Sequence, residues 1–173
     1  IRQKKTSAFC KFLSNSPQKS QKWLEALRDA EVKKTMPILS FPSVQLLGIN
    51  VRQLIESSEM QAQGMKAIAD RVPSAASVSM MDLSVEAEAF GADIILSDND
   101  IPTVHGAIVT DEDEADALEI PPVGAGRTGR YIQAIARARE LIADRPVFAG
   151  VIGPFSLAGR LVSVTESMLY CYD

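Results

Sequence analysis

Residues 75–91 read AASVSMMDLSVEAEAFG, and this stretch decides the fold class. Its first part, AASVSM, is a short apolar run that follows Pro73, which predicts a buried strand. LSVEAEAF then predicts a short helix, because Asp82 is placed to cap it and Gly91 is placed to stop it. The stretch is therefore one strand followed by one helix.

Two further apolar runs predict strands, MPILSF at residues 36–41 and VFAGVI at residues 147–152. Residues 51–72 predict a helix in two pieces, the second capped near Ser57 or Ser58. GPFSLAGRL, which follows the last run, predicts a turn and a helix of small residues. Strands that are apolar throughout and alternate with helices predict an α/β fold with a buried parallel sheet.

Other segments carry weaker signals. Residues 93–109 predict a hairpin around the turn residues DND. The acidic run TDEDEADALEI predicts a solvated helix capped by Thr110, because adjacent carboxylates on a helix point to different faces and make a poor metal site. A first helix is expected from Ser16, with Pro17 at its first turn, and a last one from Thr165.

Residues 124–129 read GAGRTG, which satisfies the glycine pattern of dinucleotide-binding loops. That pattern needs a strand before it and an acidic residue at the end of the next strand. Here the preceding EIPPV contains two prolines, and Asp144 lies before the next strand instead of at its end. We therefore interpret the glycines as the flexible lead-in to a helix whose apolar face includes Tyr131.

Composition excludes several classes of protein. The chain has 173 residues, 46% of them apolar, and two cysteines, which does not suit a disulfide scaffold. Its net charge of -4 gives no electrostatic reason to bind nucleic acid, and no apolar run is long enough to cross a membrane. The basic stretch at residues 1–34 is interpreted as the solvated face of N-terminal helices. We expect a cytoplasmic protein.

Two of these segments also carry a family resemblance. SMMDLSVEAEAFGADI at residues 79–94 and VFAGVIGPFSLAGRL at residues 147–161 resemble matching segments of the uroporphyrinogen decarboxylase superfamily. The resemblance extends over residues 36–173. The superfamily contains the decarboxylases and the zinc methyltransferases that move a methyl group from a methylated corrinoid protein to a thiol or pterin.

The resemblance implies the N-terminal portion of a (β/α)8 TIM barrel preceded by N-terminal helices. Residues 1–35 would be a helical arm, and residues 36–173 a partial barrel with about the first three βα units, truncated at the C-terminus. A complete barrel usually takes about 250 residues. An open partial barrel leaves strand edges unpaired, so this piece alone is expected to associate.

The resemblance also separates the two subfamilies. Decarboxylases bind a tetrapyrrole that carries many carboxylates, and members use an R-Q-A-G-R stretch just after the first strand. This chain has SFPSVQLLGINVRQ there, with Arg52 as the first cation. The favoured function is methyl transfer with a corrinoid protein as partner. Uroporphyrinogen decarboxylase is the first alternative, and a noncatalytic homologue that binds a corrinoid protein is the second.

In the methyltransferase branch, zinc lowers the pKa of the acceptor thiol, and a corrinoid is the methyl donor. Members bind this zinc with a His-x-Cys pair and a later Cys, all in the C-terminal half. We therefore expect zinc in the full-length protein and no zinc ligand in this segment. The chain's histidine and cysteines, His105, Cys10 and Cys171, do not form a zinc motif.

The resemblance places a site at the carboxyl ends of the predicted strands. Asp82 matches the family's aspartate and is the predicted catalytic residue, as the polar contact to acceptor or corrinoid; a purely capping role is the alternative. Glu86 lies one helical turn beyond it, so that the two carboxylates could act together. The predicted substrate-binding residues are Ser40, Phe41, Ser79, Met81, Glu86, Gly153 and Phe155.

Overall fold

The computed structural model describes residues 16–171, with side chains described from Gln21 onward. The chain divides into two compact units, Ile1–Thr35 and Met36–Asp173. In the smaller unit, helix α2 (Ser16–Asp29) begins at the residue where the sequence predicts a helix start. Cys10 lies outside the described residues.

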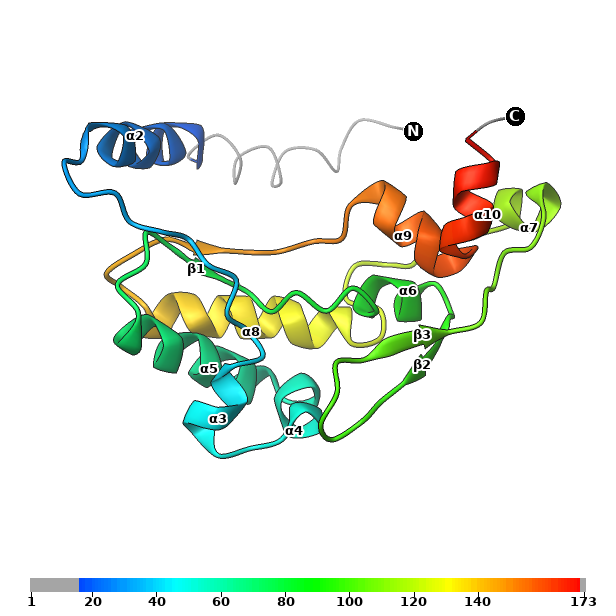
Figure 1. Cartoon of the computed structure of the whole chain (residues 1–173), viewed down its shortest axis with the longest axis horizontal. Coiled ribbons are helices and arrows are strands. Elements are labelled where there is room, and N and C mark those ends of the chain that lie inside the picture. The colour runs from blue at the N-terminus through cyan, green and yellow to red at the C-terminus, as the bar shows by residue number, and fades with distance from the viewer. Residues whose placement is uncertain (1–15, 172–173) are drawn as a thin grey trace, which may run out of the picture. The chain divides into compact units, whose positions relative to one another are not determined.

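The larger unit contains short strands and helices of unequal length (Figure 1). Its helices are α3 (Ser43–Leu47), α4 (Val51–Glu56), α5 (Ser58–Arg71), α6 (Val85–Ala89), α7 (Glu112–Asp116), α8 (Thr128–Leu141), α9 (Pro154–Leu161) and α10 (Val164–Leu169). Its strands are β1 (Ser77–Val78), β2 (Asp93–Ile95), β3 (Thr103–His105) and β4 (Val147–Phe148).

Strands β1 and β4 form a parallel pair, as the apolar runs predict, with Ser77 opposite Val147. Each strand is shorter than its apolar run. One further backbone bond follows the pair, from the amide of Ser79 to the carbonyl of Phe148 at 2.9 Å. Beyond it the amide of Gly150 bonds to the Ser79 side chain, so the ladder ends where a hydroxyl replaces a backbone carbonyl.

The predicted strand at residues 36–41 is wrong, because this segment joins no ladder and ends in a turn before α3. Pro37 has no N–H to donate to a neighbouring strand. The contact of this segment with β1 comes instead from a side chain, since the Ser40 hydroxyl donates to the carbonyl of Ser79 at 3.3 Å. The segment therefore lies beside the end of β1 without pairing to it.

The predicted hairpin is confirmed. Strands β2 and β3 pair antiparallel, with Asp93 opposite His105. The amide of Val51 donates to the carbonyl of Asp98 at 2.9 Å, which ties the hairpin turn to the start of α4. The Ser97 hydroxyl accepts from the amide of Asn99 and closes the turn.

Helices α5 and α8 run beside each other and enclose much of the core (Figure 1). Ala62 and Ala138 are fully buried between them, because small side chains let the two helices approach closely. Met65 and Ile142 complete this cluster. A second cluster brings together residues of α4, β1's carboxyl end, α6 and α8: Val51, Leu54, Ile55, Met80, Val85 and Tyr131.

The predicted caps of α7 and α10 are off by one or two residues. Asp111, not Thr110, caps α7, because its side chain accepts from the amide of Glu114 at 2.8 Å. Thr110 instead donates to the Glu114 carboxylate. Helix α10 is capped by Ser163 and not by Thr165. Ser163 has a φ of 143°, which lies in a region that residues with a side chain rarely adopt.

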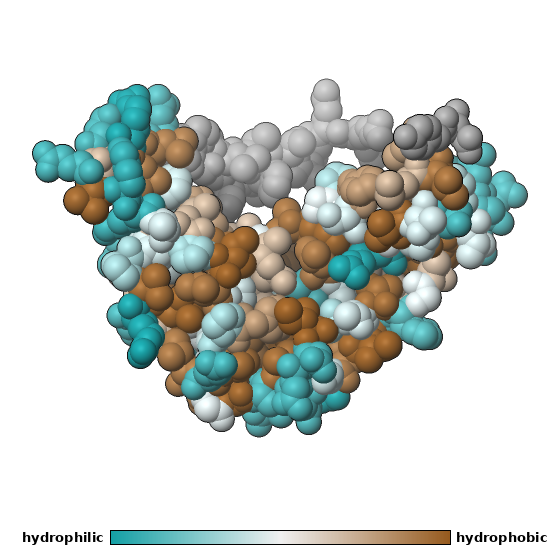
Figure 2. Space-filling view, in the orientation of Figure 1, coloured by the Kyte–Doolittle hydropathy of each residue, from teal (hydrophilic) through white to brown (hydrophobic). Residues whose placement is uncertain are grey.

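The four described strands form two separate pairs, so the described residues show an α/β fold and no complete barrel. Hydrophobic residues reach the surface over much of the larger unit (Figure 2), among them Val123 and Val151. Across residues 16–171, no helix has the length and apolar character that crossing a membrane requires.

Candidate functional site

Ser79 connects the ends of all three apolar runs that predict strands. Its carbonyl accepts from the hydroxyl of Ser40 at 3.3 Å, and its own hydroxyl accepts from the amide of Gly150 at 2.8 Å. Ser79 itself is buried, with 3% of its surface exposed. The carbonyl and hydroxyl of one serine therefore contact the ends of the other two runs.

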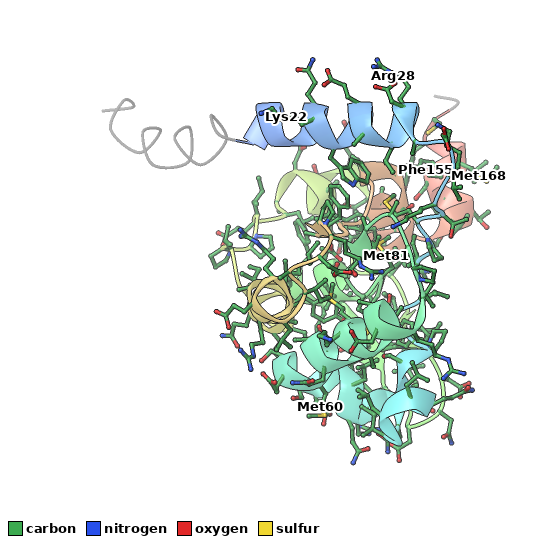
Figure 3. The ribbon with its side chains drawn as sticks, turned by 90° about the vertical axis from the view of Figure 1, so that its left-hand side faces the viewer. Lys22, Arg28, Met60, Met81, Phe155 and Met168 are labelled. Carbon is green, nitrogen blue, oxygen red and sulfur yellow. The ribbon has the colours of Figure 1, made fainter. Side chains whose placement is uncertain are left out.

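The contact between Met81 and Gly150 is close. A Cβ atom added at Gly150 would collide with the Met81 sulfur and lie 3.5 Å from the Ser79 hydroxyl. Only glycine fits at this position without displacement of Met81. Met81 lies near the middle of the larger unit, whereas Met60 lies near the bottom of the view in Figure 3.

The Asp82 side chain is fully buried and fully bonded. Its Oδ1 accepts from the amide of Ser84 at 2.9 Å and from the hydroxyl of Ser84 at 2.6 Å. Its Oδ2 accepts from Nη1 of Arg127 at 2.7 Å and from the phenol of Tyr131 at 2.8 Å. Asp82 is not the N-cap of α6, which is Ser84, but it orders the turn that leads into this helix.

Arg127 is the cation of the site, with 5% of its side chain exposed. Beyond Asp82, its Nε pairs with Glu88 and its Nη2 donates to the Ser84 hydroxyl at 2.9 Å. Burial lowers the pKa of Arg127, but the charges and hydrogen bonds of Asp82 and Glu88 outweigh it and raise the pKa above its ordinary value. The guanidinium is therefore a permanent positive charge between two carboxylates.

Tyr131 supplies the second donor to Oδ2 of Asp82. Burial raises the pKa of this phenol, and the negative charge of Asp82 and the hydrogen bond to it raise the pKa further. The phenol therefore stays protonated and acts as a donor at neutral pH.

Glu86 contacts the other side of the site. Its Oε1 accepts from the amide of Ile152 at 3.1 Å, just past the end of β4. Glu86 is half-buried, and it lines a small cavity together with Met81, Asp82 and Gly150. The two predicted carboxylates thus face one cavity, although Asp82 has its oxygens occupied.

The remaining predicted residues lie outside this small cavity. Phe41 is half-buried and packs against the core cluster that contains Met80. Gly153 is exposed and precedes α9 as its cap. Phe155, on the first turn of α9, is 60% exposed. Met81, Asp82 and Glu86 therefore line the small cavity, and Ser79, which contacts Ser40, bonds to Gly150 of its lining, whereas Phe41, Gly153 and Phe155 do not line it.

Sequence reasoning missed Arg127 and Tyr131. Both belong to the start of α8, and they are one helical turn apart, so both reach the same oxygen of Asp82. Gly124 and Gly126 have φ values of 89° and 54°, and the segment before α8 forms a tight turn. The available signal was this i, i+4 pair of polar side chains on an otherwise apolar helix face.

A second feature that sequence reasoning missed is an apolar groove of about 390 Å³ next to the site. Its walls come from α6, α8, residues 121–124 and residues 149–151. Glu86 lines both this groove and the small cavity. The groove therefore adjoins the Glu86 carboxylate, whose Oε1 accepts from the amide of Ile152.

The described residues contain no group of three or more metal-binding side chains. His105 lies exposed on β3, and Cys171 is an exposed free cysteine. The zinc that the resemblance implies therefore does not fit the described part of this chain.

Comparison with known proteins agrees with this architecture. Residues 38–172 match the family described as Uroporphyrinogen decarboxylase (URO-D). Among solved structures, a methyltransferase from Methanosarcina mazei is similar with a TM-score of 0.70 and 24% identity; the match covers 85% of this chain and 45% of that chain. No curated protein is similar in sequence. The fold is thus shared with that methyltransferase, and the chain belongs to the uroporphyrinogen decarboxylase family.

Proposed function

We propose that the protein containing this chain moves a methyl group from a methylated corrinoid, carried by a corrinoid protein in the cytoplasm, to a thiol or pterin acceptor. The chain spans less than half of the similar methyltransferase, so the proposal concerns the whole protein and this chain supplies part of its site. At 24% identity the likeness establishes the fold, and the choice among activities has to come from the site.

The observation that carries the proposal is how Arg52 and Arg127 are bound within the chain. Arg52, the first cation after residues 36–41, pairs with Asp98 at 2.8 Å and donates to the carbonyl of Leu96 at 3.1 Å. Arg127 is buried and held by Asp82 and Glu88. Both guanidinium groups are therefore engaged by carboxylates of the chain itself. A tetrapyrrole with many carboxylates needs cations at this place, whereas a methyl group needs none.

The chain's own residues would shape and orient the reactants. The corrinoid, when bound, would supply the methyl group, which a thiolate acceptor would take up by displacement. This displacement depends on alignment of the reacting atoms and on exclusion of water. Met81 and the apolar groove walls would exclude water, and Glu86 would hold a polar group of the acceptor. Asp82 would act as a fixed negative charge.

Zinc would supply the activated thiolate in the whole protein. The described residues contain no group of three or more metal-binding side chains, so the zinc ligands would come from another part of the protein.

The test is methyl transfer from methylcobalamin to a panel of thiols and folates, followed by the absorbance change of the corrinoid, with the zinc content per chain measured on the same sample. About one bound zinc and a methylated acceptor are the expected results. Glu86→Gln should weaken acceptor binding, whereas Glu140→Gln, at an exposed residue of α8, should not.

The alternatives give different results. Decarboxylation of uroporphyrinogen without methyl transfer would establish the decarboxylase instead. Binding of a corrinoid protein without turnover of any methyl group would establish the noncatalytic homologue. Either outcome would contradict the proposed methyl transfer.

A further inference from the structure

The guanidinium of Arg127 is fixed at three points. Nη1 bonds to Oδ2 of Asp82 at 2.7 Å, Nη2 bonds to the Ser84 hydroxyl at 2.9 Å, and Nε pairs with Glu88. A planar guanidinium can satisfy three such directions at once, and a lysine ammonium on a flexible stem cannot keep the same geometry. The orientation of Arg127 is therefore set by its partners.

The same contacts fix the Asp82 carboxylate. Ser84 holds Oδ1 through both its amide and its hydroxyl, and that hydroxyl also accepts from Arg127. Arg127 and Tyr131 hold Oδ2. Because both oxygens are held, the carboxylate cannot turn about its bond to Cβ without breaking several hydrogen bonds. Preorganised groups of this kind do not need to reorient during a reaction.

Arg127 reaches this position from the tight turn that precedes α8. Gly124 and Gly126 have positive φ values, and a Cβ atom on Gly129 would lie 2.9 Å from the carbonyl oxygen of Gly124. The turn and the first turn of α8 therefore deliver Arg127 and Tyr131 together to one carboxylate, 45 and 49 residues away in sequence.

We propose that Arg127 is a positioning residue for the reaction: with Glu88 as its anchor, it holds Asp82 in the direction that the bound reactants require. This inference rests on the proposed methyl transfer. It assigns Arg127 no contact with substrate, because its side chain is only 5% exposed and every nitrogen is engaged within the chain.

The first experiment measures kcat and KM of methyl transfer for Arg127→Lys and Glu88→Gln in the whole protein, normalised to the folded fraction from circular dichroism. Misplacement of a positioned group by about 1 Å can cost about 10²-fold in rate, so kcat of Arg127→Lys should fall by that order with KM for the acceptor little changed. Glu88→Gln should disturb folding less than Arg127→Lys does, because the Glu88 side chain is 32% exposed. It should also lower kcat by a smaller factor than Arg127→Lys does. Arg137→Gln, at a 43% exposed arginine of the same helix, is the matched control.

The second experiment needs no activity. With ¹⁵N-labelled arginine, the Nη protons of Arg127 should exchange slowly and give separate resonances, and Glu88→Gln should shift them, whereas Arg137 should show fast exchange. Fast exchange at Arg127 would overturn the proposal. So would folded Arg127→Lys and Glu88→Gln variants with wild-type kcat. If the wild-type protein transfers no methyl group, the proposed function fails, and the resonances still decide whether Asp82 is held as described.

Discussion

At the scale of single residues, the polar contacts of the candidate site centre on the Asp82 carboxylate. Asp82 receives an ion pair from Arg127, a hydrogen bond from the phenol of Tyr131 and two from Ser84. A buried ion pair of this kind is costly to break from one side, because the remaining charge has no water to stabilise it; removal of one partner typically costs about 3–5 kcal/mol. The cluster therefore stabilises the junction between α6 and α8 as well as orienting the site.

Tyr131 makes this cluster sensitive to alkaline pH. The pKa of Tyr131 is raised by burial, then by the charge of Asp82 and the hydrogen bond to it, whereas a tyrosine in an unfolded chain ionises near about pH 10. The folded state thus binds the proton more tightly, so its contribution to stability is complete below about pH 10 and is lost as the pH rises further. Denaturant unfolding above about pH 10 should show a steeper fall of the unfolding free energy in the wild type than in Tyr131→Phe.

Tyr170→Phe is the control, because Tyr170 is 51% exposed. Equal slopes of unfolding free energy against pH in the wild type and in Tyr131→Phe would contradict the raised pKa of Tyr131.

At the scale of elements, local signals in the sequence determine most helix ends. The sequence leaves Ser57 and Ser58 open as the cap of α5, and the structure selects Ser57, whose hydroxyl accepts from the amide of Met60 at 3.2 Å. Loss of a capping hydroxyl typically costs about 1 kcal/mol. Ser57→Ala should therefore lower the free energy of unfolding by about that amount, measured by urea denaturation.

Ser58→Ala is the matched control, since Ser58 is the first helical residue and not the cap. It should change the free energy of unfolding by less than about 0.5 kcal/mol. A larger loss for Ser58→Ala than for Ser57→Ala would show that the cap is misassigned.

A pair of helical glycines gives a second prediction at this scale. A Cβ atom on Gly64 of α5 would lie 2.6 Å from the hydroxyl oxygen of buried Ser43, whereas one on Gly159 of α9 would lie 3.5 Å from the nearest Val164 carbon. Gly64→Ala should therefore destabilise by about 1–3 kcal/mol through overpacking. Gly159→Ala should stabilise by up to about 1 kcal/mol, because alanine favours helix more than glycine. Thermal unfolding of both variants checks the pair, and two changes of the same sign would contradict it.

The strands show why part of the fold could not be predicted from the sequence. The apolar runs at residues 75–80 and 147–152 do contain paired strands, but the run at residues 36–41 joins no ladder. A strand of a parallel pair exists only through a partner distant in sequence, as Ser77 and Val147 are, whereas a helix closes its hydrogen bonds locally. Asp82 was predicted as a site residue because it matches the family's aspartate after a strand. Arg127 was not, because the contact between them depends on how α8 packs.

At the scale of the whole molecule, exposed apolar side chains set how the chain behaves in solution. Ile120, Val123 and Val151 are 88%, 95% and 74% exposed, and Val151 follows β4, which in the described residues pairs only with β1. Apolar surface next to an unpaired strand edge favours association.

We therefore expect the 173-residue chain by itself to self-associate in sedimentation velocity experiments, more strongly at higher concentration. A charge on the edge should oppose this, so Val151→Lys should shift the distribution toward monomer. Val32→Lys, at a residue that is 79% exposed in the smaller unit, is the matched control. A stable monomer of the unmodified chain at all concentrations would contradict this expectation.

The tight turn at residues 124–129 has a consequence for how such sequences are classified. Its three glycines satisfy the spacing of a dinucleotide-binding loop, yet two are required by positive φ and the third, Gly129, by the nearness of the Gly124 carbonyl. The spacing thus arises from the shape of a turn that presents an arginine to the protein's own carboxylate, and not from a phosphate. Relatives that keep this turn will keep matching nucleotide-binding patterns, and the proline pair at residues 121–122 is the feature that tells the two kinds of loop apart.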